Sequence, residues 1–191
     1  MKKRICAAVV GLVLATSACT GSDDDPARAD DTSTPKGASS TGAEPDPGPS
    51  VPPATGDLLE QASATMNAPD GYTHMPDMAD YLDSAGEDEG IGVVGLGEDP
   101  GWTTGTLAEA ASTTRRSKPF RPLPERLDDV ELDGERAFHL SGAINAYSVY
   151  DEFGALRNGN FIHVEFRQSK SVPAAERQRL IESALASFRW R

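Results

Sequence analysis

Several residue types are scarce in this chain, and each scarcity excludes something. It has only two cysteines in 191 residues, Cys6 and Cys19. The first 71 residues contain no aromatic side chain, so we expect them to contribute little to a hydrophobic core. The 18 Lys and Arg are outnumbered by 30 Asp and Glu, and a net charge of −12 repels nucleic-acid phosphates, so no nucleic-acid partner is expected. No apolar run reaches about 18 residues, so no transmembrane helix is expected in the mature protein.

The first 18 residues have the pattern of a secretory signal peptide. Three basic residues follow Met1 directly, residues 5–15 are apolar apart from one glycine, and three small residues follow at positions 16–18. A basic start, a short apolar stretch and small residues before a cleavage point are typical of such signals. The apolar stretch is too short to span about 30 Å of hydrocarbon as a stable helix. We therefore expect residues 1–18 to be removed.

The residues around the expected cleavage point resemble the lipobox of bacterial lipoproteins. The segment is Leu14-Ala15-Thr16-Ser17-Ala18-Cys19, and it departs from the family pattern at Thr16, where leucine is usual. The resemblance implies that the Cys19 thiol receives a diacylglyceryl group, with acyl chains such as palmitate, and that a dedicated peptidase cuts before it. An ordinary secretory signal with a chance cysteine is the alternative.

The distribution of cysteine favours lipidation of Cys19. Cys6 lies in the segment expected to be removed, so the mature chain would keep a single thiol and form no internal disulfide. An odd free thiol is a liability in an oxidising compartment, and acylation removes it. Two acyl chains give a stable anchor, so the expected location is the extracytoplasmic face of the cell membrane.

Residues 19–56 are expected to form the lipidated cysteine and a disordered acidic tether. Positions 20–56 hold seven Pro, five Gly, five Ser and five Thr, together with seven acids and two bases. Such a composition cannot offset the entropy of ordering. As a flexible coil the tether would span about 33 Å. It is interpreted as a spacer, with a glycosylated stalk as the alternative.

Residues 57–191 are expected to be a single folded α+β domain with four helices. Asp57 with an acid three residues later predicts a short helix that ends before Pro69, and residues 78–82 have the spacing of a two-turn helix. Thr106 and Glu109 form a capping-box pattern for a helix that ends near Ser117. The last helix is expected from about residue 173, with an inward stripe of Leu180, Ile181, Ala184, Leu185 and Phe188.

The remaining pattern predicts strands joined by hairpins. Asp133-Gly134 and Asn158-Gly159 are two-residue hairpin signals, and alternating or apolar runs flank both. Such strands with helices before and after predict an antiparallel sheet of about five to six strands flanked by helices. The expected strands are residues 72–75, 91–96, 130–132, 137–140, 147–153 and 161–166.

The same elements resemble the PsbP-like fold. The features that carry the resemblance are a glycine-containing early strand, a following helix, the hairpin Val130-Glu131-Leu132-Asp133-Gly134, and a closing helix that ends Ala184-Leu185-Ala186-Ser187-Phe188-Arg189-Trp190. LpqN-type lipoproteins of high-GC Gram-positive bacteria share that fold. The resemblance covers about residues 70–191 and implies a binding or assembly protein rather than an enzyme. Its motifs concern packing, so it supplies no catalytic residues.

Two sequence patterns look like ligand sites and are interpreted otherwise. Residues 90–95 match G-x-G-x-x-G, but the glycines alternate with apolar residues inside a strand and acids follow, so close packing of a helix or a bulge is expected instead of a nucleotide. Four acids around Gly86 could attract Ca²⁺, but they lack the alternate spacing of a calcium loop. They are Asp83, Glu87, Asp88 and Glu89.

Candidate catalytic and metal-binding residues are few. The three histidines are His74, His139 and His163, and the last two could join a metal site only if their strands adjoin. No G-x-S-x-G, H-E-x-x-H or P-loop motif occurs, and no catalytic residue, cofactor or metal site is assigned. Acid pairs that could serve acid–base chemistry are Asp128-Asp129 and Asp151-Glu152.

One basic cluster in the acidic domain could dock an anionic glycan or phosphate partner, although charges at the end of a helix explain it as well. It consists of Arg115, Arg116, Lys118 and Arg121. The expected function is a membrane-anchored, extracytoplasmic, non-catalytic module for binding or envelope assembly, whose partner is an envelope protein or a small ligand. The alternative is a surface-displayed, hydrolase-like enzyme that uses Asp and Glu groups.

Overall fold

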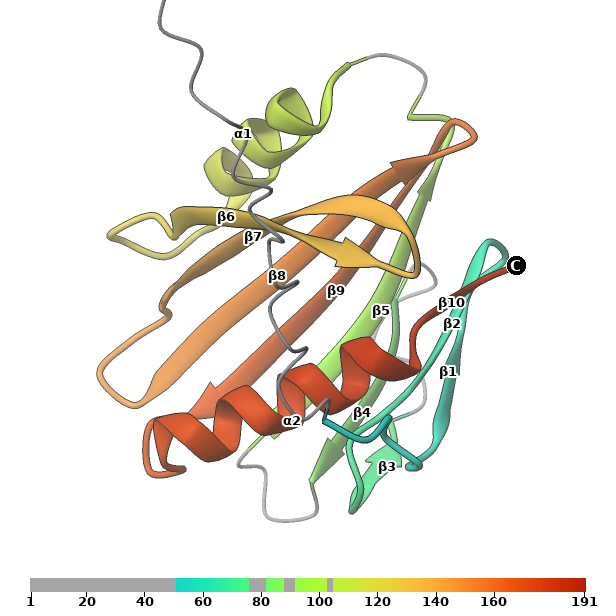
Figure 1. Ribbon diagram of the computed structural model, residues 1–191. Coiled ribbons are helices and arrows are strands. Elements are labelled where there is room, and N and C mark those ends of the chain that lie inside the picture. The colour runs from blue at the N-terminus through green and yellow to red at the C-terminus, as the bar shows by residue number, and fades with distance from the viewer. Residues whose placement is uncertain (1–50, 76–81, 88–91, 103–104) are drawn as a thin grey trace, which may run out of the picture. The chain divides into compact units, whose positions relative to one another are not determined.

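The computed structural model describes residues 51–75, 82–87, 92–102 and 105–191. Its largest element is an antiparallel sheet of seven strands (Figure 1). The strands are β3 (Tyr72–His74), β4 (Leu82–Glu87), β5 (Gly92–Pro100), β6 (Glu125–Leu132), β7 (Glu135–Ala143), β8 (Ser148–Arg157) and β9 (Asn160–Ser169). Their order across the sheet is β3-β4-β5-β9-β8-β7-β6.

Two helices and a small second sheet complete the architecture. The second sheet contains β1 (Leu58–Glu60), β2 (Ala64–Asn67) and β10 (Arg189–Trp190), in the order β1-β2-β10. Helix α1 (Leu107–Ser117) joins β5 to β6, and helix α2 (Ala174–Ser187) leads into β10 at the end of the chain. No helix in these described ranges combines the length and apolarity needed to cross a membrane.

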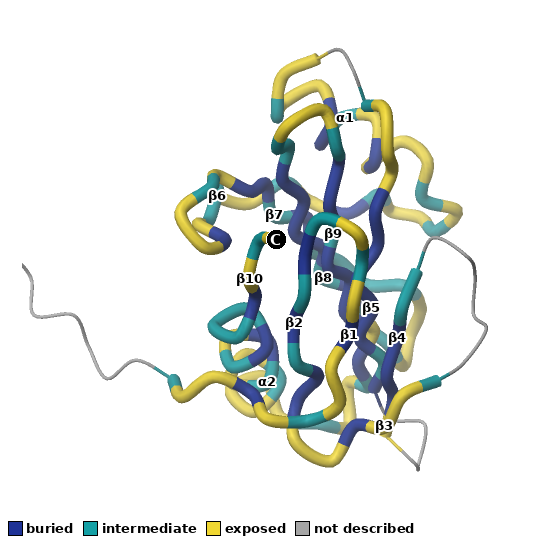
Figure 2. The backbone as a smooth tube through the Cα atoms, turned by 90° about the vertical axis from the view of Figure 1, so that its right-hand side faces the viewer, coloured by how far each residue is buried: buried dark blue, intermediate teal, exposed yellow. Residues whose placement is uncertain are grey.

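The seven-stranded sheet separates two hydrophobic clusters, because successive side chains of a strand point to opposite faces. The larger cluster lies under α2 and the small sheet, where Met66, Phe166 and Phe188 pack with other apolar residues. The smaller cluster lies under α1 and includes Ala110, Phe138 and Phe161, among others. Figure 2 shows the buried positions concentrated in β2 and in the central strands of the large sheet. The two faces therefore carry different coverings.

Several expected elements are present. Both hairpins form at the predicted dipeptides, where Asp133 and Asn158 adopt positive φ angles of 46° and 52° and glycine follows each. Helix α1 begins at the predicted capping box, since Thr106 and Glu109 bond reciprocally. In α2, the predicted inward stripe is buried at Ile181 and Ala184 and continues to buried Phe188.

Two expectations about the fold are wrong. The large sheet has seven strands rather than five to six, and a three-stranded sheet accompanies it. Residues 57–68 form the β1–β2 hairpin and not a helix. Asp57 accepts a hydrogen bond from the backbone N–H of His74 at 2.8 Å instead of capping a helix. The predicted two-turn helix at residues 78–82 falls outside the described residues except for Leu82, which begins β4.

Residues just before β1 pack on the domain. The N–H of Ala54 donates to the carbonyl of Ser183 in α2 at 2.8 Å, and Ala54 is buried. The N–H and hydroxyl of Thr55 both donate to Asp70, at 3.0 and 2.8 Å. Residues 54–56, which the composition places in the tether, thus contact α2 and the loop before β3.

Candidate functional site

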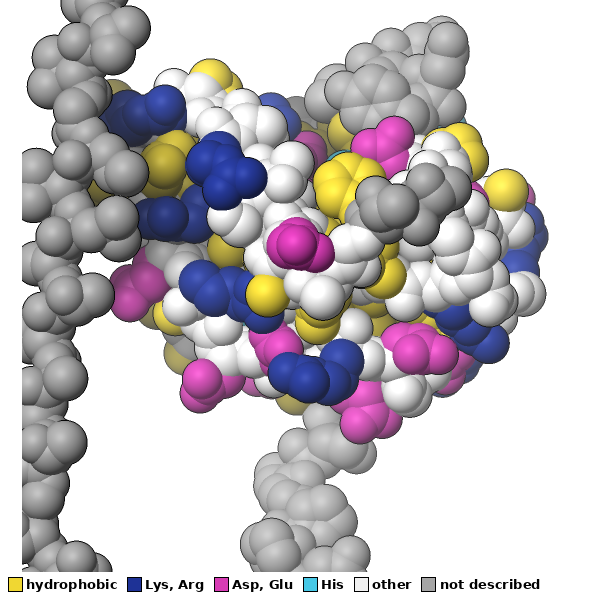
Figure 3. Space-filling model, turned by 90° about the horizontal axis from the view of Figure 1, so that it is seen from above, with side chains coloured by type: hydrophobic (Ala, Val, Ile, Leu, Met, Phe, Trp, Pro, Cys, Tyr) yellow, Lys and Arg dark blue, Asp and Glu magenta, His cyan; other side chains and the backbone are white. Residues whose placement is uncertain are grey.

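Helix α1 places the basic residues Arg115, Arg116 and Lys118 at its C-terminal end. Its inner face buries Ala110 and Ala111 against Phe138 and Leu140 of β7, so small residues let the helix lie close to the sheet. Basic residues are favourable at the end of the helix, where backbone carbonyls carry partial negative charge. Figure 3 looks onto this end of the molecule and shows several Lys and Arg side chains on its surface.

The structure divides the predicted basic cluster. The Lys118 ammonium turns inward and lies 2.9 Å from the Glu152 carboxylate. Arg115, Arg116 and Arg121 remain exposed, and none has a carboxylate within 4 Å among the described residues. Their recorded bonds go to neutral oxygens, such as the one from Arg115 Nε to the Pro124 carbonyl at 2.6 Å. Three positive charges therefore stay available at the surface.

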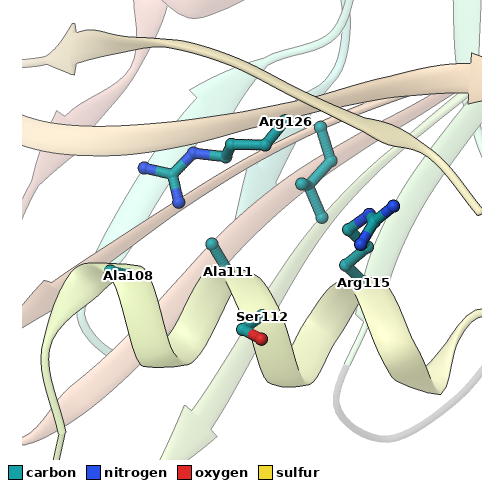
Figure 4. Close-up of a pocket in the computed structure, with 6 residues that line it drawn as sticks. Ala108, Ala111, Ser112, Arg115 and Arg126 are labelled. Atoms are coloured by element: carbon teal, nitrogen blue, oxygen red, sulfur yellow. The ribbon is translucent and has the colours of Figure 1, made fainter. Parts of the chain in front are cut away.

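A cavity of about 210 Å³ lies between α1 and strands β6 and β7; we call it the α1 cavity. Arg126 extends from β6 toward Ala111, and Arg115 lies one helical turn further along α1 (Figure 4). Asp129 bonds both Arg126 and Arg136, so it neutralises that pair only in part. The α1 cavity is lined by Ala108, Ala111, Ser112, Arg115, Arg126 and Leu140.

A second cavity, of about 460 Å³, lies on the other flank of α1 and shares Ser112 with the first. Arg116 borders it, and so does the indole of Trp102. The indole Nε1–H is buried and has no hydrogen-bond partner among the described residues. An unpaired donor and a guanidinium beside one cavity are suited to a ligand that accepts hydrogen bonds. The lining residues are Trp102, Gly105, Glu109, Ser112, Thr113 and Arg116.

Behind the helix end, ionisable side chains form a cluster on the α1-facing side of the sheet, in which the glutamates are buried and Arg167 is exposed. Glu152 and Glu165 face each other directly across β8 and β9 and are 1% and 8% exposed. The Tyr150 hydroxyl lies 2.6 Å from Glu152 Oε2 and 3.3 Å from Glu165 Oε2. Arg167 pairs with Glu165 at 3.0 Å, while Lys118 pairs with Glu152. We call these five residues the polar cluster.

The environment sets the charges in the polar cluster. Burial by itself raises the pKa of Glu152, but the His163 ring, the Lys118 charge and the Tyr150 hydroxyl together hold it below its ordinary value of 4.5. The contact from His163 Nδ1 to Glu152 Oε1, at 3.5 Å, is longer than the 2.9 Å contact from Lys118 to Glu152 Oε2. Burial, followed by the nearby glutamate charges, raises the pKa of Tyr150 far above 10. Glu152 is thus an anion and Tyr150 a neutral donor at neutral pH.

The predicted acid pairs do not converge. Asp151 and Glu152 are neighbours in β8 and therefore point to opposite faces of the sheet. Asp151 Oδ1 contacts His139 Nε2 at 3.0 Å on the α2 side, whereas Glu152 belongs to the polar cluster. In the other pair, Asp129 binds two arginines and Asp128 is exposed. In neither pair do the two carboxylates face a common site where they could act on one substrate.

The histidines are also separated. Strand β8 lies between the strands that carry His139 and His163, and the register places the two rings on opposite faces of the sheet. The third, His74, contacts Asp83 at 2.6 Å near the surface. No group of three or more potential metal ligands occurs among the described residues.

The other predicted features are resolved only in part. Cys19 lies outside the described residues, as do Gly90, Ile91, Asp88 and Glu89. Gly92 and Gly95 are in β5, as the strand interpretation requires, and not at the start of a helix. Side chains pack closely against them rather than a helix: a Cβ on Gly92 would lie 2.0 Å from the Tyr72 hydroxyl, and one on Gly95 would lie 2.8 Å from Leu82.

Sequence reasoning missed Tyr150, Glu165, Arg126 and Trp102. Alternation along β8 and β9 is the signal that could have found the first two, because residues two apart share a face. It does not reveal which strands are neighbours. Arg126 and Trp102 have no signal in the sequence, because the turn of α1 over the sheet brings them to the cavities.

Comparisons with known proteins define the fold. No protein-family model matches the chain, and no curated protein matches its sequence. The solution structure of cyanobacterial PsbP (CyanoP) from Synechocystis sp. PCC 6803 matches with a TM-score of 0.51 and 11% identity, over 71% of this chain and 92% of that one. A crystal structure from Bacteroides thetaiotaomicron VPI-5482 matches with a TM-score of 0.47 and 10% identity, over 67% of this chain. The match spans only 45% of that longer chain.

The domain is thus an antiparallel sheet with helices on both faces, and its fold is PsbP-like. This confirms the fold resemblance recognised in the sequence. Similarity at this level of identity concerns the fold alone, because one fold carries many functions.

Proposed function

We propose that this protein is a lipid-anchored extracytoplasmic lipoprotein whose domain is a non-catalytic binding module for an anionic ligand or partner. The anchor rests on the lipobox-like segment that ends at Cys19 and on the acidic, proline-rich residues that follow it. The LpqN-type lipoproteins that the sequence resembles combine such an anchor with this fold. The binding role rests on the surface around α1.

The observation that carries the binding proposal is a local reversal of charge. Residues 57–191 hold 23 acids and 13 bases, yet arginines with no carboxylate partner in the described structure gather at α1. They border two cavities that also present a serine hydroxyl and an indole N–H. A positive surface on a negative molecule attracts anions to that surface, while the negative remainder of the domain repels them.

The polar cluster supports a binding role over catalysis. A hydrolase would need a carboxylate with access to substrate, since geometry comes before pKa in acid–base catalysis. Glu152 and Glu165 are buried, and each already bonds a cation and the Tyr150 hydroxyl. Structural ion pairs account for both glutamates. The Lys118–Glu152 pair joins the end of α1 to the sheet behind the proposed binding surface, and the Arg167–Glu165 pair lies within β9.

The anchor is tested by Cys19→Ser. We expect this variant to remain unprocessed or to leave the membrane fraction, while the fold of residues 51–191 is unchanged. Two acyl chains hold a protein stably, each buried methylene contributing about 0.8 kcal/mol. A net negative chain cannot replace them by attraction to an anionic membrane. The measurement is membrane fractionation with intact-mass analysis of the N-terminal peptide.

Cys6→Ser serves as the matched control, because it replaces a cysteine within the segment that processing removes. It should leave processing and fractionation unchanged. A mature protein that begins at a residue other than Cys19 would contradict the proposal. So would a Cys19→Ser protein that stays membrane-bound without lipid.

The anionic ligand is tested by Arg115→Ala. Titration of the purified protein with inorganic phosphate, followed by amide chemical shifts, should move signals of α1 in the unchanged protein. Removing one charge-assisted hydrogen bond should weaken phosphate binding at least tenfold, since such bonds contribute about 1.5–3 kcal/mol. Binding should also weaken as salt rises, because the guanidinium is exposed.

The matched control is Arg179→Ala, which removes an exposed arginine from α2 on the other side of the sheet. It should leave phosphate affinity unchanged. Equal losses in the two variants would mean that phosphate responds only to net charge, and the α1 surface would then not be the binding site.

A further inference from the structure

A third cavity, of about 390 Å³, lies far from the α1 surface, under the first turns of α2. Gln168 and Tyr72 lie on the α2-facing side of the large sheet, and the beginning of α2 covers them. Its size is within the range of small-molecule sites. We call it the α2 cavity; its lining residues are Asp70, Tyr72, Glu87, Gln168, Ser171, Val172, Pro173, Glu176 and Leu180.

The inner wall of the α2 cavity has an unused hydrogen-bond acceptor. Gln168 is 3% exposed, and its side-chain oxygen Oε1 has no hydrogen-bond partner among the described residues. Buried acceptors without partners are rare in native proteins because they lose their hydration without compensation. An amide oxygen in this position is satisfied by a ligand that brings an N–H or O–H donor into the cavity.

The charge of the lining indicates which donor fits. Asp70, Glu87 and Glu176 line the α2 cavity, and its described lining includes no basic residue. The N-terminus of α2 contributes only about +0.5 elementary charge, too little to offset three carboxylates. An anion would therefore be repelled here, and a cation with N–H donors would be attracted.

Tyr72 supports the same conclusion. Burial, followed by the charge of Glu87, raises the pKa of the Tyr72 phenol against a smaller opposing effect of the neighbouring Gln168 side chain, so the hydroxyl stays neutral at physiological pH. Tyr72 and Glu87 are directly paired across β3 and β4, which places the phenol beside an exposed carboxylate. A neutral phenol presents an oxygen acceptor and a flat apolar ring to a ligand.

The form of the cation follows from the walls. Val172, Pro173 and Leu180 make one side apolar, which suits a hydrocarbon chain better than a hydrated metal ion. The described carboxylates also do not gather into a metal-binding group. A quaternary ammonium has no N–H to give to Gln168, whereas a primary ammonium has three.

We propose that the α2 cavity binds a small aliphatic primary amine, whose ammonium group bonds the Gln168 oxygen and the surrounding carboxylates while its methylenes pack on Val172, Pro173 and Leu180. This site is separate from the anionic surface at α1. The protein would then accept ligands of opposite charge on opposite sides of its sheet.

The probe is 1,5-diaminopentane, titrated by calorimetry into the purified protein at pH 7 and low salt. We expect saturable binding, and at least tenfold weaker binding to Gln168→Leu, which keeps the bulk of the side chain without its acceptor. Because that substitution removes an unpaired buried polar atom, thermal unfolding should not move to lower temperature. Glu87→Gln, at an exposed position, should weaken binding severalfold and reduce its dependence on salt.

Three comparisons make the proposal falsifiable. Glu131→Gln on β6 removes an exposed carboxylate away from the cavity and should leave amine affinity unchanged. Arg115→Ala should also leave it unchanged, which separates this site from the one at α1. Tetramethylammonium and Ca²⁺ should not displace the diamine. The proposal would be overturned if the unchanged protein did not bind the diamine, or if Gln168→Leu and Glu87→Gln bound it as tightly as the unchanged protein. Displacement of the diamine by tetramethylammonium or Ca²⁺ would also overturn it.

Discussion

Replacing Phe188 with alanine is expected to lower the free energy of unfolding by about 3–5 kcal/mol, the usual cost of truncating a buried phenylalanine. Phe188 is fully buried at the C-terminal cap of α2 and meets Trp190 edge to face, with ring centroids 4.9 Å apart. It joins α2, β10 and the large sheet in one cluster. Since small domains have about 5–15 kcal/mol of stability, the loss would be a large fraction of the total.

Chemical denaturation monitored by circular dichroism measures this loss. Tyr147→Ala is the matched aromatic control, because Tyr147 is 79% exposed and its removal should change stability by less than about 0.5 kcal/mol. Arg191→Ala, which breaks an exposed pair with Glu60, should cost no more than about 1 kcal/mol. Losses of similar size in all three variants would mean that α2 does not close over the sheet through Phe188.

The second large effect is expected from Glu152→Gln, at about 3 kcal/mol. The substitution keeps the shape of the side chain and its contact with the Tyr150 hydroxyl, but it leaves the Lys118 ammonium, 16% exposed, without its counter-charge. Removing one partner of a buried pair costs about 3–5 kcal/mol, and partial access of Lys118 to water places the value at the lower end. Glu60→Gln, in an exposed pair, is the control and should cost at most about 1 kcal/mol.

The pH dependence of unfolding gives an independent reading of the same pair. The pKa of Glu152 is lower in the folded protein than its ordinary value of 4.5, so the charged form favours folding. This contribution is present above pH 4.5 and is lost as the pH falls through the folded-state pKa. The stability difference between the unchanged protein and Glu152→Gln should therefore shrink below pH 4.5. If this stability difference stayed constant from pH 7 to pH 3, the Lys118–Glu152 pair would not be its cause.

A double-mutant cycle separates pairing from burial. Lys118→Met should be destabilising alone, since it leaves Glu152 charged and buried. Combined with Glu152→Gln, it should restore part of the lost stability, because neither charge is then unpaired. Additive losses would show that the two side chains do not interact.

The elements that could be predicted from the sequence are those decided within a few residues. Asp133-Gly134 and Asn158-Gly159 adopt the positive φ angles that tight hairpins require, and glycine has no Cβ to oppose them. The start of α1 follows from Thr106 and Glu109, which satisfy each other's hydrogen bonds across one turn. In both cases the deciding contacts are local.

Residues 57–68 show where local reasoning fails. Their spacing fits a short helix, but β2 pairs with β10, so Thr65 lies opposite Arg189 and Ala64 opposite Trp190. That neighbour is more than 120 residues away, and no local pattern contains it. Backbone pairing with β10, together with burial of Leu59 and Met66, overrides a weak helical preference. The one additional strand of the large sheet, β4, instead pairs with its neighbours in the sequence, β3 and β5.

The candidate sites divide in the same way. By itself the sequence determined the excess of acidic residues and the basic end of α1, and it supplied the lipobox-like segment at Cys19 as a hypothesis. Each of these features depends only on the residues themselves or their neighbours in the sequence. Only the tertiary structure decided that Glu152 meets Lys118 of α1, that Asp151 meets His139, and that Gln168 lies under α2 beside Tyr72. The physical reason is strand order: residues that share a face are brought together by pairing across the sheet, and pairing between distant strands depends on how the whole core packs.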